Sequence, residues 1–225
     1  MSRLHSNRLC LALAIALITP SVSTIAAPSP TVFRVQVVAD DMCCQGCVQK
    51  VAAQLYSLPG VTNVQGDVPK RLVTITAKPS QKLTLERIWQ AVEKGKGGPS
   101  KLVSYAATYT LTRSEKLNPE SRLAAGQYRL EVDALHNNDE AKAIAGQLNR
   151  IPGVEKIGVD LERRTLAIHA SAAPVISPWV LVTAAERAHS QPISVTGPFG
   201  IFAIERAADG KAVATARVSQ NPPQK

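Results

Sequence analysis

The amino-acid sequence predicts an α+β protein in which a ferredoxin-like β-α-β-β-α-β unit occurs twice. The first observation is an alternation of strand-like and helix-like patterns over residues 30–112. The second is the return of that pattern over residues 127–206, where Pro152-Gly153-Val154 repeats the turn Pro59-Gly60-Val61. The offset between the two turns is 152 − 59 = 93 residues. Units of this order place two helices on one face of a four-stranded antiparallel sheet.

The elements of the first unit follow from the spacing of its apolar residues. Phe33, Val35 and Val37 alternate with polar residues, as a half-buried strand requires. Val51 and Leu55 belong to an apolar stripe at helical spacing. In order, we expect a strand at 32–39, a helix at 48–58, strands at 61–68 and 72–77, a helix at 85–92 and a last strand at 101–112.

Every cysteine outside the N-terminal leader lies in one loop, Asp41-Met42-Cys43-Cys44-Gln45-Gly46-Cys47. The C-x-x-C spacing lets the sulfurs of Cys44 and Cys47 converge on one soft metal ion or on each other. The start of the following helix supplies partial positive charge and free N–H groups, which stabilise a thiolate. Thiolates select Cu(I), Hg(II), Zn(II) or Cd(II). The same spacing is found in thiol–disulfide oxidoreductases, so a redox protein is the alternative class.

This loop, the strand before it, the helix after it and the order of elements resemble the heavy-metal-associated domain. That family includes copper chaperones, the soluble modules of metal-pumping ATPases and the periplasmic mercuric-ion binding protein. Its Gly-Met-x-Cys-x-x-Cys loop is matched here by Met42, Cys44 and Cys47. The resemblance implies that the two cysteines are the metal ligands and that Met42 packs into the core below them. It implies Cu(I) first and Hg(II) second, with Zn(II) or Cd(II) as further candidates. It also implies a basic residue near the loop, for which Lys94 and Lys96 are the candidates.

A carrier of this kind exchanges its ion with other proteins. The resemblance therefore implies a metal-donor or metal-acceptor protein as the partner, such as a metal-transporting membrane protein. A scavenger of Hg(II) and a pair of purely structural units are the remaining alternatives.

Two residues of the loop depart from the family pattern. Asp41 stands where the family has glycine, which predicts a tighter or differently turned loop. Cys43 is an additional thiol and a candidate third ligand. Since the side chains of adjacent residues diverge, we expect Cys43 to face solvent, away from the other two sulfurs.

The second unit has lost the metal-binding residues. At the offset of 93, Asn137 and Glu140 occupy the positions of the C-x-x-C cysteines. His136 is expected to be a solvated loop residue, and His169, in the middle of a strand, is expected to face away from the core. Residues 127–206 are therefore expected to form a degenerate second ferredoxin-like domain that does not bind soft metal.

The ends of the chain and the segment between the units carry other signals. Residues 1–26 are expected to be a secretory signal peptide, because Arg3 and Arg8 precede a short apolar stretch and small residues follow it. The mature protein would then be exported, periplasmic or extracellular. It would reach a membrane only if the leader stays uncleaved, since the apolar stretch is short for a membrane span. We expect residues 113–126 to be a linker and residues 207–225 a disordered tail.

Composition and the motifs that the sequence lacks argue against several other classes of protein. The chain has 26 Lys and Arg against 17 Asp and Glu, a formal charge of +9, and removal of the two leader arginines leaves 9 − 2 = +7. No run of basic residues is interleaved with aromatic ones, so nucleic-acid binding is not expected. Neither a P-loop nor a candidate Ser/His/Asp set appears, and we expect the protein not to be an enzyme. The mature chain would keep three cysteines in one loop, which is no disulfide framework.

Overall fold

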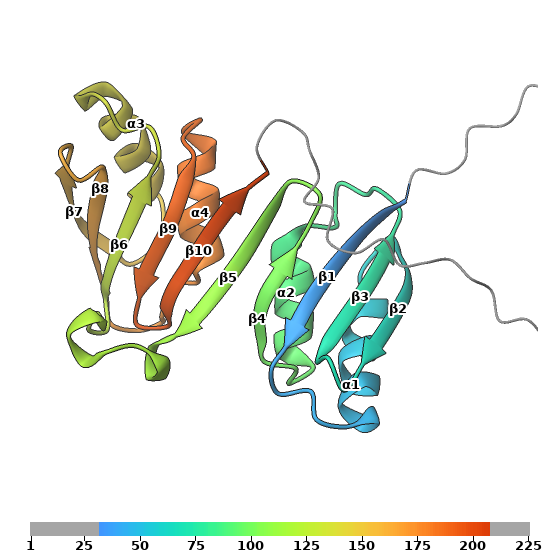
Figure 1. Cartoon of the computed structure of the whole chain (residues 1–225). Helices are drawn as coiled ribbons and strands as arrows, with labels where there is room; N and C mark the ends of the chain where they lie inside the picture. The colour runs from blue at the N-terminus through green and yellow to red at the C-terminus, as the bar shows by residue number, and fades with distance from the viewer. Residues whose placement is uncertain (1–31, 208–225) are drawn as a thin grey trace, which may run out of the picture. The chain divides into compact units, whose positions relative to one another are not determined.

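The computed structural model describes residues 32–207, which form one ten-stranded antiparallel sheet and four α-helices (Figure 1). The strand order is β2-β3-β1-β4-β5-β10-β9-β6-β8-β7. The strands are β1 Phe33–Ala39, β2 Val61–Asp67, β3 Leu72–Ala77, β4 Pro99–Val103, β5 Ala107–Arg113, β6 Gln127–Val132, β7 Val154–Asp160, β8 Thr165–Ala170, β9 Pro192–Gly197 and β10 Gly200–Arg206. The helices are α1 Gln45–Tyr56, α2 Leu85–Lys94, α3 Asn138–Leu148 and α4 Pro178–Arg187, with short 3₁₀ helices η1 Ser114–Lys116 and η2 Pro119–Ser121.

The first half has the expected ferredoxin-like order of β1, α1, β2, β3, α2 and β4. Val35, Val37 and Ala39 of β1 are buried, and their neighbours along the strand are exposed or half-buried, as the alternating sequence predicts. In Figure 1, α1 and α2 cover one face of strands β1 to β4. Val51 and Leu55 of α1 are fully buried and belong to the hydrophobic core. The α+β class and the antiparallel sheet are confirmed.

The second half repeats the element boundaries of the first half at an offset of 93 residues. β2, β3, α2 and β5 begin and end 93 residues before β7, β8, α4 and β10. The left-handed residues return as well, since Gly60 and Arg71 have positive φ and so do Gly153 and Arg164.

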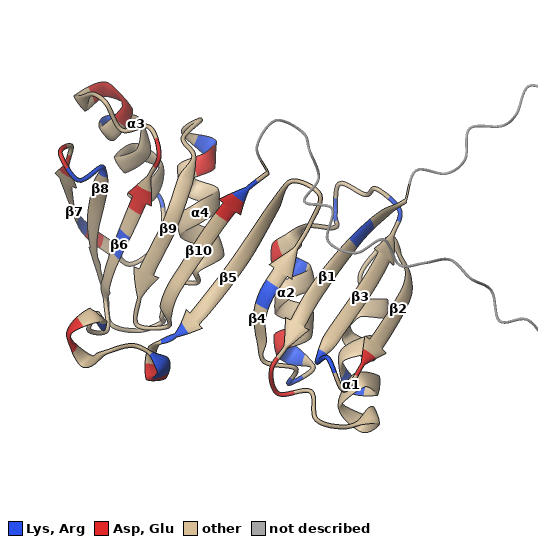
Figure 2. Cartoon of the chain, viewed as in Figure 1, with Lys and Arg blue, Asp and Glu red and all other residues tan. Residues whose placement is uncertain are grey.

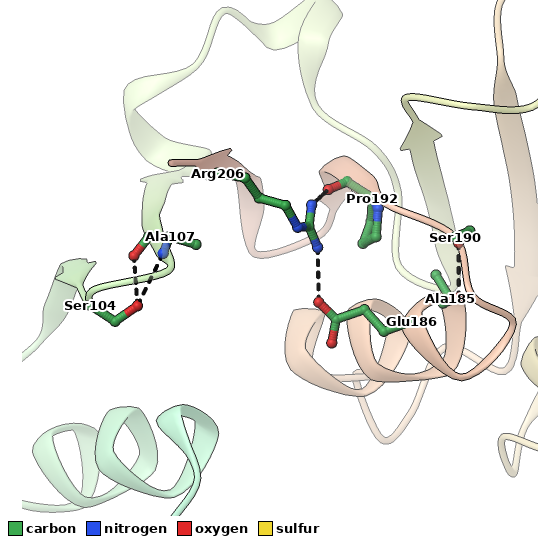
Figure 3. Close-up of polar contacts among 7 residues, drawn as sticks. All are labelled: Ser104, Ala107, Ala185, Glu186, Ser190, Pro192 and Arg206. Carbon is green, nitrogen blue, oxygen red and sulfur yellow. Dashed lines mark hydrogen bonds and ion pairs between the residues drawn. The ribbon is translucent and has the colours of Figure 1, made fainter. Parts of the chain in front are cut away.

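The last strand of the first unit differs from the prediction. The sequence predicted one strand over residues 101–112, but the chain turns after Val103, and β4 and β5 form an antiparallel hairpin. The side chain of Ser104 holds this turn (Figure 3). Its hydroxyl donates to the carbonyl of Ala107 at 2.9 Å and accepts from the N–H of Ala107 at 3.1 Å. Serine stabilises turns through such local hydrogen bonds. The turn contains no Gly or Pro, which is why the sequence pattern did not indicate it.

The two halves are joined by the second strands of two hairpins, β5 of β4–β5 and β10 of β9–β10. β5 pairs with β10 over its whole length, from Ala107 opposite Arg206 to Arg113 opposite Gly200. Between β5 and β6, the segment expected to be a linker, residues 113–126, contains η1 and η2.

Four aromatic residues pack beneath the β5–β10 pair. They come from α2, β5, α4 and β10 and are Trp89, Tyr109, Trp179 and Phe202. The ring centroids of Trp89 and Trp179 are 6.0 Å apart, and Phe202 lies 5.1 Å from Trp179 and 5.7 Å from Trp89. α2 and α4 therefore lie on the same face of the sheet and share one core.

Arg206, the last residue of β10, forms hydrogen bonds to β9 and to α4. Its guanidinium donates to the carbonyl of Pro192 at 2.7 Å and to the carboxylate of Glu186 on α4 at 2.9 Å (Figure 3). The last strand of the second half is thus tied to the helix beneath it.

The expected signal peptide, residues 1–26, and residues 208–225 of the expected tail lie outside the described residues. Within residues 32–207, no helix combines the length and the apolar character that a membrane span needs.

Candidate metal centre

The cysteine loop connects β1 to α1, and Cys44 is the N-cap residue of α1. The backbone of Cys44 is extended, with φ −154° and ψ 166°, and its carbonyl accepts the first N–H groups of the helix, from Cys47 at 3.1 Å and Val48 at 3.3 Å. Its side chain does not cap the helix. The helix start therefore faces the thiols with its partial positive charge uncompensated.

The structure brings the predicted pair together. Cys44 Sγ lies 3.0 Å from Cys47 Sγ, as C-x-x-C at a helix start predicts. Cys44 is exposed and Cys47 is half-buried, so the pair is open to an incoming ion or thiol.

Cys43 lies differently from the expectation. It is exposed, as predicted, but its Sγ is not turned away: it lies 3.7 Å from Cys47 Sγ. The Sγ atoms of all three cysteines lie within 4.8 Å of one another. Among residues 32–207, these three cysteines form the cluster of at least three His, Cys, Asp or Glu side chains that could hold a metal ion.

The neighbouring sulfurs change the acidity of these thiols. The hydrogen bond from the side chain of Cys44 is the largest cause that lowers the pKa of Cys47 from 9.0 to about 7, and a backbone hydrogen bond from Cys43 adds to it. The hydrogen bond to Cys47 is in turn the main cause that raises the pKa of Cys43. The lowered pKa favours the thiolate form of Cys47 near neutral pH.

Met42 is fully buried beneath the loop, as expected. Its backbone N–H donates to the carbonyl of Ala39 at the end of β1. A buried residue directly before the cysteines anchors the loop to the core and leaves the thiols at the surface.

Asp41 needs no glycine conformation in this fold, because its φ is not positive. The N–H of Asp41 donates to the carbonyl of Gly97 at 2.9 Å, and that of Asp40 donates to Gly98 at 3.0 Å. Gly98 carries the positive φ, +60°, and a Cβ there would collide with the carboxylate of Asp41. The glycine that the family places in the cysteine loop is thus replaced by an Asp that packs on a glycine of the opposite loop.

Arg113, the last residue of β5, and Lys116 of η1 form ion pairs with these aspartates. Arg113 Nη2 lies 3.8 Å from Asp41 Oδ2, and Lys116 Nζ lies 3.4 Å from Asp40 Oδ2. Both cations lie in residues 113–126, which were expected to be a linker, and their approach to the loop was not predicted because it depends on the β4–β5 turn. Ser100 also donates to Asp40 Oδ1 at 2.8 Å.

Charge is confined to the base of the loop. In Figure 2 the acidic segment at the end of β1 is followed by an uncharged stretch that leads into α1. Of the two expected lysines, Lys94 ends α2 and Lys96 lies in the next turn, directly before Gly97, whose carbonyl accepts from the loop. Both lysines are exposed.

The same positions of the second half carry a helix cap. Asn137 Oδ1 accepts from the N–H groups of Asp139 at 3.0 Å and Glu140 at 2.9 Å. Glu140 in turn accepts from the backbone N–H of His136 at 2.7 Å. The side chains of His136 and His169 are exposed, as expected. The polar groups at this helix start are thus occupied by each other.

Exposed, paired thiols at a helix start on an antiparallel α+β sheet define a domain suited to bind or transfer a metal ion. Residues 37–98 match the family model of the heavy-metal-associated domain, and this part of the chain belongs to that family. Domains of this family bind soft metal ions through cysteines.

Two solved structures from Bacillus subtilis are similar to this chain. One is the water-soluble region of the P-type ATPase CopA, with 14% identity, coverage of 84% of this chain and 99% of that chain, and a TM-score of 0.29. The other contains the N-terminal soluble domains of CopA, with 15% identity, coverage of 73% and 94%, and a TM-score of 0.29. None of the curated proteins matches this chain.

Proposed function

We propose that this chain is an exported soft-metal-ion binding protein that sequesters or transfers Cu(I) through the thiolates of Cys44 and Cys47. The observation that carries the proposal is the 3.0 Å approach of the two Sγ atoms on an exposed loop of a heavy-metal-associated domain. A Cu(I) ion is soft and binds thiolates in preference to harder ligands.

Exposure of the site favours transfer as well as binding. An incoming thiolate of a partner protein can bind the ion before a bond to Cys44 or Cys47 breaks, so no step releases a bare ion. The partner is therefore a metal-donor or metal-acceptor protein with its own soft ligands, such as a metal-transporting membrane protein. The protein has no catalytic role in this proposal.

Export rests on the leader pattern of residues 1–26, and it places the protein in the periplasm or outside the cell. The second half is a degenerate copy of the first, produced by duplication of a whole domain. The ungapped offset of 93 residues and the cap in place of the cysteines support this interpretation.

The test is a titration of the reduced protein with Cu(I) in competition with a chromogenic chelator. We expect about one bound Cu(I) per chain, as a single thiolate site implies. Cys44→Ser and Cys47→Ser should each weaken Cu(I) binding, whereas Gln45→Ser, an exposed change in the same loop, should not. An affinity that is unchanged in both cysteine variants would contradict the proposal.

A thiol–disulfide redox function is the second candidate, because the same 3.0 Å approach and the lowered pKa of Cys47 suit disulfide exchange. A redox protein would pass its disulfide to a model substrate over many turnovers and would not need Cu(I). A Hg(II) scavenger would instead bind Hg(II) in preference to Cu(I) when both are offered.

A further inference from the structure

The thiol of Cys43 lies close enough to those of Cys44 and Cys47 for all three sulfurs to contact one ion. Cys47 Sγ has two sulfur neighbours, Cys44 at 3.0 Å and Cys43 at 3.7 Å. We propose that Cys43, Cys44 and Cys47 bind one soft ion together in a three-coordinate sulfur site. This inference rests on the proposed function and specifies how the ion is coordinated.

The spacing of the sulfurs suits three ligands better than two. With a metal–sulfur bond of about 2.3 Å, two sulfurs on opposite sides of an ion lie ~4.6 Å apart, and three sulfurs around it lie ~4.0 Å apart. The Cys44–Cys47 and Cys43–Cys47 distances are 3.0 and 3.7 Å. Both distances are shorter than either spacing, so the sulfurs must separate when an ion binds, and they separate less for a trigonal site than for a linear one.

The backbone explains how adjacent cysteines reach one point. Cys44 is extended and precedes the helix, and Cys47 lies in the first helical turn, so Cys47 extends back between its two partners. Cys43 and Cys44 need not point in the same direction, because each has only to bring its sulfur near that of Cys47.

The surroundings of the loop favour ions that need only three ligands. Met42 is fully buried in the core, and the carboxylate of Asp41 packs over Gly98, beside Arg113. In residues 32–207 no further His, Cys, Asp or Glu joins the three sulfurs within 4.8 Å. Structural Zn(II) takes four protein ligands, whereas Cu(I) and Hg(II) are satisfied by fewer thiolates.

A third thiolate also changes how the ion leaves. When a thiolate of an acceptor replaces one of the three ligands, two sulfurs of this protein still hold the ion. The ion therefore keeps sulfur ligands of this protein throughout the first step of the exchange.

The experiment compares the reduced full-length protein with Cys43→Ser and with Gln45→Ser as the matched control. Each is loaded with one equivalent of Cu(I), and X-ray absorption counts the sulfur ligands. Alkylation of the loaded proteins, followed by mass spectrometry, counts the cysteines that copper protects. We expect three sulfurs and three protected loop cysteines in wild type and in Gln45→Ser. In Cys43→Ser we expect two of each and an affinity at least about tenfold weaker.

Two other outcomes overturn the inference in different ways. Two sulfurs per copper in wild type, with Cys43 alkylated and unchanged affinity in Cys43→Ser, would refute the three-thiolate site and leave the proposed function intact. A wild-type protein that takes up no Cu(I) would refute both. Since the side chain of Cys43 is exposed, its replacement should leave the thermal unfolding of the metal-free protein unchanged, which excludes misfolding as the cause.

Discussion

Cys44 and Asn137 occupy the same place in the two halves of the chain, yet only Asn137 caps its helix. Their backbones are nearly identical, with φ and ψ of −154° and 166° at Cys44 and −149° and 167° at Asn137. The amide oxygen of Asn137 accepts two N–H groups of α3, whereas the side chain of Cys44 accepts none from α1. The first half therefore keeps its helix start free for the thiols, at a cost in stability.

The cap of α3 can be tested directly. Asn137→Ala should destabilise the protein by about 1 kcal/mol, because two N–H groups lose their acceptor. Asn138→Ala, the same change one residue later, should have a smaller effect, since it lies inside the first turn of α3. Chemical denaturation of both variants measures the difference. Equal losses would contradict a capping role for Asn137.

The converse substitution tests the first helix. With a backbone like that of Asn137, Cys44→Asn should cap α1 and raise the free energy of unfolding by roughly 1 kcal/mol. It should also weaken Cu(I) binding, because one thiolate of the site is lost. Thermal unfolding and metal titration of one preparation test both results, and Cys44→Ala, which cannot cap, is the control.

Gly98 is the glycine on which the geometry of the loop depends. Gly98→Ala should destabilise the protein by more than about 1 kcal/mol, because φ is +60° and the new Cβ would collide with the carboxylate of Asp41. Gly146→Ala is the matched control. Gly146 lies within α3 with no atom near its Cβ position, so alanine should be neutral or stabilising there by up to about 1 kcal/mol. Denaturation curves in which Gly98→Ala is less stable than Gly146→Ala would confirm the prediction, and the reverse order would refute it.

The acidity of Cys47 gives a pH dependence. Since its pKa is lowered from 9.0 to about 7, the thiolate forms as pH rises through about 7 and is lost below it. The rate of alkylation at Cys47, followed by mass spectrometry from about pH 5 to about pH 10, should rise with a midpoint near 7. In Cys44→Ala the midpoint should move upward, because the hydrogen bond from the Cys44 side chain is the main cause of the shift and alanine cannot donate one. A midpoint that stays in place would contradict that cause.

Phe202 tests the junction between the halves. It is fully buried among Trp89, Tyr109 and Trp179, so Phe202→Ala should cost about 3–5 kcal/mol through the cavity that it leaves. Ile193→Ala, at a residue of β9 that is 38% exposed, should cost much less. Denaturation followed by tryptophan fluorescence reports on both, since the tryptophans line the new cavity. A loss as small as that of the control would show that the aromatic cluster does not stabilise the junction.

Local patterns predicted the elements that hold the site. Alternation predicted β1, helical spacing predicted α1, and the C-x-x-C spacing predicted the approach of Cys44 and Cys47. The burial of Met42 followed from the resemblance to the family. These features depend on residues close together in the chain, which is why the sequence could predict them.

The features that escaped prediction depend on contacts that are weakly marked or distant in sequence. The turn at Ser104 has no Gly or Pro and was therefore included in a strand. The pairing of β5 with β10 joins residues 87 to 99 apart in the chain, and the contacts of Arg113 and Lys116 with the cysteine loop follow from the position of β5. The approach of Cys43 to Cys47 depends on the loop backbone, which spacing alone does not define.

The β5–β10 pairing also has a consequence for aggregation. Two separate five-stranded sheets would expose four edge strands, and unpaired edges invite association with other chains. Joined as they are, the described strands leave two edges, β2 and β7. Both edges carry polar or charged residues, including Asp67 on β2 and Lys156 on β7, which disfavour further strand addition. The second half therefore covers, through β10, the β5 edge of the sheet that carries the cysteine loop.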